Sequence, residues 1–532
     1  MASSIIVKLF FSLSLFSSLL SISSSSSSSS SLDFWCNQTP HSDECKHHMS
    51  QSHQRFRPNH PSEFKKMLVQ LALDQAQAMH KKAQEYGPKC VTKMQKCVFS
   101  DCLKLYDNTI FHLNRTLQAL QTNSCSLSDA QTWLSTALTN IETCRRGALQ
   151  LRVGEFTAQN NVRNNVRKMI SNVLAVNGKF LKQENYTEEE IKAHGFPSWF
   201  SRLERRLLSL KPSSVKANLV VAQDGTGQSK TVQAAIDVAS RRKVKNRFVI
   251  RVKKGIYEEN IEVDKDNENL MIIGDGMTLT IITGSKSVKD GITPSMSATA
   301  GIDGAHFFAR DITFRNMAGP EKGQAVALRS ASDLSVFYRC SIEGYQDTLM
   351  AASQRQFYRD CRILGTVDFI WGNAAVVLQN CRILVRKPLQ GQAIMITAQG
   401  RDDPFQNTGI SIINSQIQAA PDFRKVYHSY ETYLGRPWQQ YAPVVVMKTY
   451  IEGLVNPLGW SPWDNSAVGE DTCYVGEYMN YGAGSSTKSR VKWPGFHVIT
   501  NPNEANQFSV VSFLAGGIWL PRTGVPFTIG VN

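Results

Sequence analysis

One strand-bearing unit repeats along the second half of the chain. Its clearest copies lie at 337–342, 357–363 and 377–383, each with a cysteine near its middle, and weaker copies follow at 412–417 and 446–451. The steps between copies, about 20 to 34 residues, suit a parallel β-helix whose coils vary in length. We therefore expect the second half to be an all-β solenoid.

The repeat places Cys340, Cys361 and Cys381 in one column, with Ser415 and Thr449 further along it. Equivalent positions on neighbouring parallel strands are within disulfide reach. A Cys340–Cys361 disulfide is the pairing that we favour, and a Cys361–Cys381 bridge is geometrically similar. The alternative is a column of small buried side chains with free thiols.

Two aspartates share the same repeat register. Asp347 follows Cys340 by seven residues, and Asp368 follows Cys361 by seven. Neighbouring coils of a solenoid bring them to the spacing of adjacent strands, about 4.8 Å. Two carboxyls so close cannot both ionise easily, so one becomes an acid and the other remains a nucleophile. Hydrolysis of an ester or a glycoside uses such a pair, although single surface aspartates are common in turns.

Polar and aromatic residues accompany this pair. Gln346 precedes Asp347 and Gln324 lies about one coil earlier, so both amides can hold a developing oxyanion; a structural glutamine ladder between coils is the alternative. In 433–438, Arg436 can fork onto a carboxylate and Trp438 can stack on a sugar ring. Tyr345, Phe369 and Trp371 are expected to add apolar wall around a carbohydrate.

The first half of the chain has a different texture. From 33 to 170 glycines are few and apolar residues recur at helical spacing, which predicts an all-α bundle, with one helix running from Asp129 to Cys144. Cys36 and Cys45 can staple a short hairpin, and Cys102 and Cys144 can tie two antiparallel helices. Cys90, Cys97, Cys125 and Cys473 have no partner that spacing assigns.

Residues 1–31 read as a secretory signal peptide followed by a serine-rich segment. The alternative is a membrane anchor, but the apolar stretch is broken and shorter than the ~20 residues that span a bilayer. Acceptor sequons at Asn37, Asn114 and Asn185 agree with secretion and predict glycosylation. We expect a secreted protein of the cell wall with no membrane contact.

The formal charge of +15 invites a nucleic-acid interpretation. A secreted protein is separated from the nucleic acid of the cell, and the sequence contains no nucleic-acid recognition motif beside this charge. No C-x-x-C pair indicates a zinc site, and 11 cysteines leave at least one thiol unpaired within the chain. The composition thus excludes little beyond nucleic-acid binding and a structural zinc.

A linker from 171 to 215 separates the two halves. It contains the dibasic-dileucine run Arg205-Arg206-Leu207-Leu208. A solvated helix end is one interpretation, and cleavage by a processing protease between two domains is the other, which we favour. The enzyme half is then 216–532.

Four ordered motifs carry a family resemblance. The segments at 323–329, 344–349, 365–372 and 434–438 closely resemble those of plant pectinesterases, and 33–170 resembles the four-helix pectinesterase-inhibitor domain that precedes many of them. The resemblance implies a right-handed parallel β-helix that hydrolyses galacturonate methyl esters of homogalacturonan in pectin and releases methanol. It also implies no metal and no organic cofactor.

The resemblance assigns roles by motif. Asp368 matches the nucleophile that forms an acyl-enzyme, and Asp347 matches the acid that protonates methanol and then activates water. Gln346 matches the oxyanion donor, and Gln324 contributes to binding or to the same hole. Arg436 is implied to orient Asp368, as in the family.

The remaining implied contacts are with sugar rings. Trp438 is expected to contact a galacturonate, and Trp371 stands where phenylalanine is more usual. A family threonine that contacts substrate aligns with Pro294, with Thr293 beside it, so the chain departs from the family pattern at this contact.

Two other functions compete with the esterase. A glycosidase or lyase acting on the pectin backbone is compatible with a carboxylate pair on a β-helix. A non-catalytic wall-binding or inhibitor protein, with the bundle as its active module, is the third. For the esterase we expect a monomer, and the N-terminal domain acts as an autoinhibitor or folding pro-region; inhibitor proteins are possible further partners.

Overall fold

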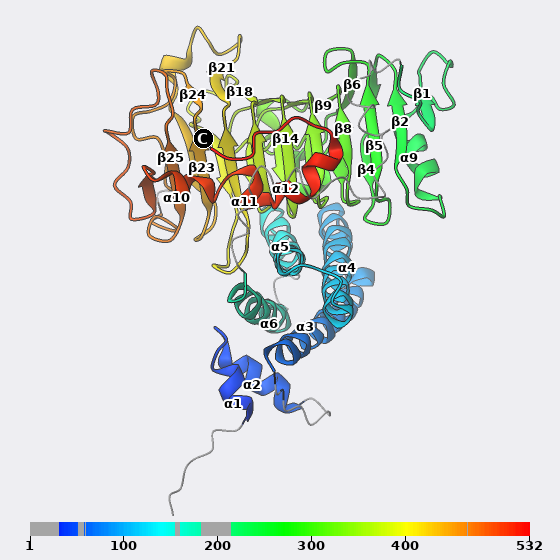
Figure 1. The fold of residues 1–532 in the computed structure, drawn as a ribbon. Helices are drawn as coiled ribbons and strands as arrows, with labels where there is room; N and C mark the ends of the chain where they lie inside the picture. The colour runs from blue at the N-terminus through cyan, green and yellow to red at the C-terminus, as the bar shows by residue number, and fades with distance from the viewer. Residues whose placement is uncertain are drawn as a thin grey trace, which may run out of the picture.

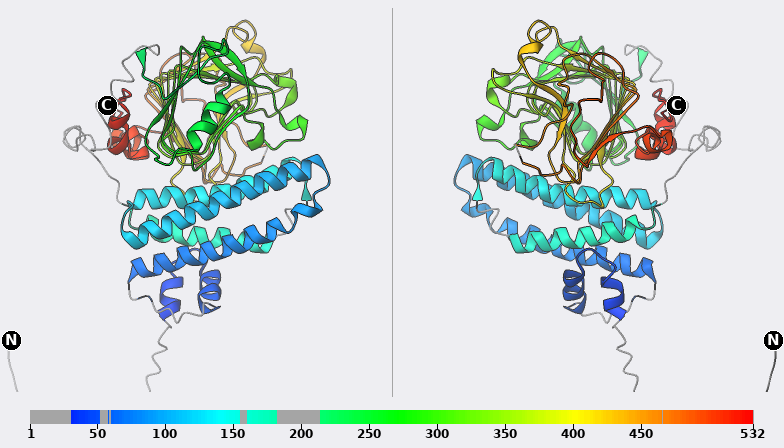
Figure 2. Two further views of the ribbon diagram at one scale, coloured as in Figure 1. Left: turned by 90° about the vertical axis from the view of Figure 1, so that its right-hand side faces the viewer. Right: turned by 90° about the vertical axis from the view of Figure 1, so that its left-hand side faces the viewer.

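The computed structural model describes residues 31–51, 58, 60–154, 160–181, 214–464 and 466–531. An all-α bundle lies beneath a β-helix, and the long helices run across the axis of the β-helix (Figures 1 and 2). Among the described residues, no helix is long and apolar enough to cross a membrane.

Four long helices form the bundle within the described part of the chain. They are α3 (Pro61–Gln84), α4 (Lys93–Thr122), α5 (Leu127–Gln150) and α6 (Asn160–Gly178). Capping boxes begin two of them, because the Thr92 hydroxyl accepts from Gln95 N–H and the Ser126 hydroxyl accepts from Asp129 N–H. Helix α6 continues to Gly178, eight residues past the expected end of the bundle at 170.

A short hairpin, α1 (Ser31–Cys36) and α2 (Ser42–Gln51), lies on the side of the bundle away from the β-helix (Figure 1). The Cys36–Cys45 disulfide closes this hairpin. A second disulfide, Cys102–Cys144, joins α4 to α5. Both predicted pairings of the N-terminal half are confirmed.

Three parallel sheets wind around one apolar interior and form the expected β-helix. The 11-stranded sheet contains β1 (Leu219–Val221), β2 (Phe248–Val252), β5 (Leu270–Gly274), β8 (Phe308–Arg310), β11 (Ser335–Tyr338), β14 (Arg355–Arg359), β17 (Ala375–Gln379), β20 (Gly409–Ile413), β23 (Pro443–Met447), β25 (Tyr474–Tyr478) and β26 (Phe496–Val498). The eight-stranded sheet contains β3 (Gly255–Glu258), β6 (Thr280–Gly284), β9 (Thr313–Asn316), β12 (Ser341–Glu343), β15 (Arg362–Gly365), β18 (Arg382–Val385), β21 (Gln416–Ala419) and β24 (Tyr450–Ile451). The seven-stranded sheet contains β4 (Ile261–Val263), β7 (Ala300–Ile302), β10 (Leu328–Ser330), β13 (Leu349–Ala351), β16 (Ile370–Gly372), β19 (Ile394–Gln399) and β22 (Thr432–Pro437).

Helices also cover parts of the β-helix. Helix α9 (Val232–Ser240) packs at its N-terminal end. Helices α10 (Pro502–Asn506), α11 (Val510–Leu514) and α12 (Gly516–Trp519) lie along the outer face of the 11-stranded sheet, where Val510, Leu514 and Trp519 are buried (Figure 1). This leaves the outer face of the seven-stranded sheet to the bundle.

Each repeat of the sequence is two strands rather than one. A single residue with a left-handed backbone makes the corner between them, for example Arg339 (φ 50°), Asp360 (φ 53°) and Asn380 (φ 57°). Aspartate and asparagine adopt this conformation more readily than most residues. A cysteine follows each of these three corners, and the corner directs its side chain into the interior.

The predicted column is confirmed by the strand register, which aligns Ser341, Arg362 and Arg382 and therefore the cysteine before each of them. The favoured Cys340–Cys361 disulfide is wrong, because Cys340, Cys361 and Cys381 are buried free thiols. The thiol of Cys361 donates to the carbonyl of Phe337 at 3.2 Å. Stacked side chains that point into the same interior do not converge as a disulfide requires.

Candidate active site

A cavity of about 540 Å³ lies between the seven-stranded sheet and helix α5. Most of the site residues suggested by the motifs line it: Thr293, Gln324, Gln346, Asp347, Asp368, Trp371, Arg436 and Trp438. These residues come from five coils, so the solenoid brings together segments that are up to about 140 positions apart in the sequence. Tyr345, which we expected to add apolar wall, does not line this cavity.

The floor of the cavity is one register column on the outer face of the seven-stranded sheet. Met350, Trp371, Ala398 and Arg436 occupy equivalent positions on β13, β16, β19 and β22. Equivalent positions on successive parallel strands point to the same face, so these four side chains form a continuous floor. The Arg436 guanidinium lies at one end of this floor.

The two aspartates lie just before two neighbouring strands of this sheet. Asp347 and Asp368 both have left-handed backbones, with φ of 62° and 49°. The Asp347 N–H donates to the carbonyl of Val367 at 3.0 Å, which joins the two turns. The equal spacing in the sequence therefore corresponds to equivalent positions on adjacent coils.

Arg436 contacts only one of the two carboxyls by hydrogen bonds. Its Nε and Nη2 donate to the two oxygens of Asp368 at 2.9 and 2.6 Å. Such a forked pair is geometrically specific and stronger than a neutral hydrogen bond. Among the described residues, the Asp347 carboxyl has no such partner, so the pair is asymmetric.

The electrostatics follow this asymmetry. Burial raises the pKa of Asp347 well above its usual range, and the nearby charge of Asp368 raises it further. Burial also raises the pKa of Asp368, but the hydrogen bonds and charge of Arg436 oppose that rise. This asymmetry favours Asp347 as the protonated group and Asp368 as the ionised one.

Gln324 and Gln346 are half-buried at the edge of this pair. The N–H of Ala325 donates to the carbonyl of Gln346 at 3.2 Å, so the two glutamines belong to hydrogen-bonded neighbouring coils. Their amides can donate to an oxyanion formed beside the carboxyls.

Three tryptophans form the aromatic side of the cavity. The rings of Trp371 and Trp438 meet edge to face with centroids 5.4 Å apart, and Trp463 lies 6.5 Å from Trp438. The indole N–H of Trp371 donates to the carbonyl of Asp347 at 3.2 Å, so this residue also supports the turn of the acid. Phe369 is fully buried in the β-helix interior and does not form wall, contrary to our expectation.

Sequence reasoning missed Trp463 and Asp464. The Arg436 guanidinium lies 4.0 Å over the ring of Trp463, and its Nη1 lies 3.4 Å from Asp464. The segment Trp460–Asp464 follows Trp438 by about one coil, and its two tryptophans were the available signal.

Helix α5 covers the cavity. Arg146 places its guanidinium 4.8 Å over the ring of Trp438. On the other side, the hydroxyl of Thr293 donates to Asp101 of α4 at 2.6 Å, and both side chains are buried. The residue suspected of touching substrate is therefore covered by the N-terminal domain.

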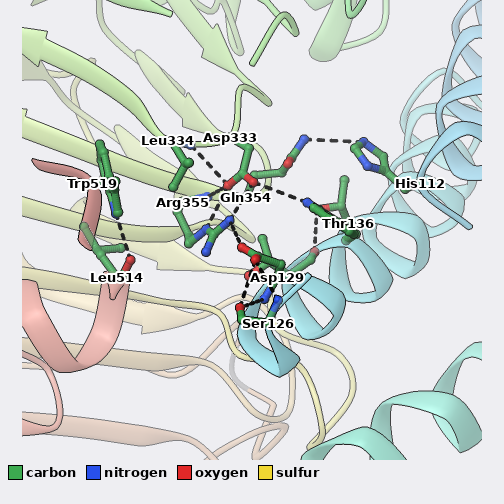
Figure 3. Close-up of polar contacts among 12 residues, drawn as sticks. His112, Ser126, Asp129, Thr136, Asp333, Leu334, Gln354, Arg355, Leu514 and Trp519 are labelled. Carbon is green, nitrogen blue, oxygen red and sulfur yellow. Dashed lines mark hydrogen bonds and ion pairs between the residues drawn. The ribbon is translucent and has the colours of Figure 1, made fainter. Parts of the chain in front are cut away.

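Further polar contacts join the N-terminal bundle to the β-helix. Arg355 donates to Asp333 of its own domain and to Asp129 of α5, both at 2.8 Å (Figure 3). Further ion pairs join the domains: Lys104–Asp303 at 2.8 Å, Arg167–Asp402 at 2.7 Å and Lys265–Asp107 at 2.6 Å.

One histidine is buried in this interface. His112 of α4 lies 3.4 Å from the amide of Gln354 (Figure 3), and burial lowers the pKa of His112 to about 3. This histidine is neutral while the domains are docked.

Other expected features lie outside the cavity. Asn37 is exposed beside the hairpin, and Asn114 is half-buried within α4. The segment 1–30, Asn185 and the dibasic run at 205–208 lie outside the described residues.

Comparisons with known proteins divide the chain at the same place as the fold. A family model described as pectinesterase matches residues 218–517, and one described as plant invertase/pectin methylesterase inhibitor matches residues 30–176. The inhibitor match ends two residues before the end of α6.

The relatives match nearly the whole chain. A probable pectinesterase/pectinesterase inhibitor 60 of Arabidopsis thaliana is 56% identical over 503 residues, which are 93% of each protein. Pectinesterase 2 of Citrus sinensis is 48% identical over 520 residues, 98% of each. The solved structure of a pectin methylesterase from carrot is 55% identical, covers 60% of this chain and 99% of its own, and has a TM-score of 0.58.

Proposed function

This chain belongs to the pectinesterase family, with a pectin methylesterase inhibitor domain before the enzyme, and we propose that Asp368 and Asp347 carry out its ester hydrolysis. The protein is a carboxylic ester hydrolase that de-esterifies pectin. The observation that carries the proposal is the forked pair between Arg436 and Asp368, since no described residue forms such a pair with Asp347.

The first half-reaction forms an acyl-enzyme. A carboxylate oxygen of Asp368 attacks the ester carbonyl carbon, and the carbonyl electrons move onto oxygen. The amide of Gln346, with Gln324 beside it, donates to this oxyanion. When the intermediate collapses, the bond to the methoxy oxygen breaks, Asp347 gives that oxygen its proton, and methanol leaves.

The second half-reaction restores the enzyme. Asp347, now a carboxylate, takes a proton from water while the water oxygen attacks the acyl carbon. The bond to Asp368 breaks, so Asp368 leaves as a carboxylate and the product is a galacturonate acid. One ester and one water thus give one acid and one methanol.

The aromatic side of the cavity suits a sugar chain. A pyranose ring stacks on an indole, and Trp438 presents its ring on the side that Arg146 covers. Trp371 lies on the same side of the cavity and narrows the space there. Thr293 has a hydroxyl that can hydrogen-bond a uronate once Asp101 has left it, which suggests a contact beside Pro294.

We further propose that the bundle is an autoinhibitor until a protease cuts near Arg206. The position of α5 over Trp438 and Asp368 supports this, because a pectin chain cannot enter while α5 is docked. We expect the signal segment to be removed on secretion to the cell wall, and Asn37, Asn114 and Asn185 to carry glycans. Mass spectrometry of the secreted protein tests the two cleavage sites and the glycans.

Methanol release from methylated pectin by the secreted protein tests the reaction. We expect Asp368→Asn and Asp347→Asn to lose nearly all activity, while Asp471→Asn, an exposed aspartate, stays as active as the wild type. Full activity of Asp368→Asn would sink the mechanism. Unchanged polymer length distinguishes the esterase from a backbone glycosidase or lyase.

A further inference from the structure

Arg386 links the turns that carry the two aspartates. It follows strand β18, and its N–H donates to the carbonyl of Gly365 at 2.8 Å, just before the turn of Asp368. Its guanidinium reaches one coil further, two coils from its own, where Nη1 donates to the carbonyl of Gly344 at 3.2 Å and Nη2 donates to the Tyr345 hydroxyl at 2.7 Å. Gly344 and Tyr345 begin the turn of Asp347.

The guanidinium has two further contacts. It stacks on the ring of Tyr345 at 3.9 Å from the centroid, and its Nε donates to Asp422 at 3.4 Å. A planar fork that stacks and donates in two directions is a property of arginine that lysine lacks. The side chain therefore holds one orientation over Tyr345.

Tyr345 is also the point where the two turns meet. Its carbonyl accepts from the N–H of Thr366 at 3.0 Å and from the hydroxyl of Thr348 at 2.9 Å. Thr366 lies in the turn of Asp368, and Thr348 directly follows Asp347. A side chain that fixes Tyr345 thus fixes the distance between the two turns.

The geometry of these turns needs such support. Asp347 and Asp368 both lie in turns with left-handed backbones, outside the hydrogen-bonded strands. Turns that relax even slightly move Gln346 and the two carboxyls relative to one another. A misplacement of about 1 Å can cost about a hundredfold in rate.

We propose that Arg386 is a positioning residue for the hydrolysis, which holds the Gln346–Asp347 turn in register with the Asp368 turn. The inference rests on the proposed roles of the two aspartates. Arg386 acts through Tyr345 and the main chain and does not contact the substrate. Because it sets the geometry of the reacting groups, it affects kcat more than KM.

The test compares variants of the secreted protein produced from the full-length chain. In Arg386→Met we expect kcat to fall about ten- to a hundredfold while KM stays within about twofold. Arg386→Lys recovers part of the loss, because an ammonium can still donate to Gly344. The matched control is Arg382→Met, an exposed arginine of β18, the strand that Arg386 follows, and this variant keeps the wild-type kcat.

A double-mutant cycle with Tyr345→Phe separates positioning from general stability. Tyr345→Phe removes only the hydroxyl that Arg386 contacts, so we expect a smaller loss of kcat and an effect that nearly disappears in the Arg386→Met background. Thermal unfolding of each variant gives the folded fraction to which kcat is normalised. Should Arg386→Met fail to fold, Arg386→Lys and Tyr345→Phe give the same comparison.

Two results would overturn the inference. One is a kcat per folded molecule in Arg386→Met within twofold of wild type, and the other is full additivity of the two substitutions. Asp368→Asn in the same assay keeps the conclusions apart. If it remains active, the proposed mechanism fails, whereas an inactive Asp368→Asn beside a fully active Arg386→Met removes only the role of Arg386.

Discussion

The guanidinium of Arg146 lies 4.8 Å over the ring of Trp438, so a side chain of the inhibitor domain covers the ring that we propose to contact a sugar. The Nε of Arg146 also contacts Glu142 at 2.8 Å, which holds it in this position. Under the proposed function, substrate and α5 compete for one surface, and the strength of this contact sets how often the cavity opens.

We predict that Arg146→Ala weakens the docking of α5 over the cavity. A partly desolvated cation over an indole contributes about 1–2 kcal/mol, so methanol release from an uncleaved chain carrying Arg205→Ala and Arg206→Ala should rise about five- to thirtyfold. Arg145→Ala is the control, because Arg145 also pairs with Glu142 but does not stack on Trp438. Equal release from the two variants would contradict the prediction.

The pH dependence of the enzyme should report Arg436. The nucleophile works as a carboxylate, so activity falls as the pH drops through the pKa of Asp368. Arg436 lowers that pKa, and in Arg436→Met the pKa rises, so we expect the acid limb of kcat/KM to move to higher pH. We also expect kcat/KM at its optimum to fall about ten- to a hundredfold.

A pH–rate profile from the secreted protein measures this shift. The alkaline limb, which follows loss of the Asp347 proton, should also move to higher pH, because the charge of Arg436 lowers the pKa of Asp347 too. An acid limb that stays in place in Arg436→Met would show that the arginine does not control the ionisation of Asp368.

Much of the site was predictable because a solenoid converts sequence register into spatial register. Equal spacing after Cys340 and Cys361 placed Asp347 and Asp368 on adjacent coils, and a motif placed Arg436 near them. The contact between Arg146 and Trp438 was not predictable, since it depends on how two separately patterned domains dock. Phe369 was assigned to the wrong face, because a turn before β16 resets the alternation of side chains.

Trp371 should support both stability and rate. Its indole N–H donates to the carbonyl of Asp347, so Trp371→Phe leaves that buried carbonyl without its donor and opens a gap beside Trp438. We expect a loss of about 1–2 kcal/mol in unfolding free energy and a several-fold lower kcat.

The matched control for this change is Trp519→Phe. Trp519 is equally buried, and its N–H donates to the carbonyl of Leu514 at 3.0 Å, on the outer face of the 11-stranded sheet (Figure 3). We expect a similar loss of stability with unchanged kinetics. Denaturant unfolding and initial rates on both variants make the comparison, and a kinetic effect in Trp519→Phe of the same size would remove the specific role of Trp371.

Cysteine labelling should separate two classes of thiol in the uncleaved chain. Cys340, Cys361 and Cys381 are almost fully buried, and burial raises the pKa of the Cys361 and Cys381 thiols well above the usual range. Since the thiolate is the reactive form, we expect an alkylating reagent to modify these three only after unfolding. Half-buried Cys125 should react sooner, and the Cys36–Cys45 and Cys102–Cys144 pairs should react only after reduction.

Peptide mapping with two distinguishable reagents, one added before unfolding and one after, assigns each cysteine to its class. A Cys340–Cys361 cross-linked peptide would show that the coils carrying the two aspartates are joined covalently after all.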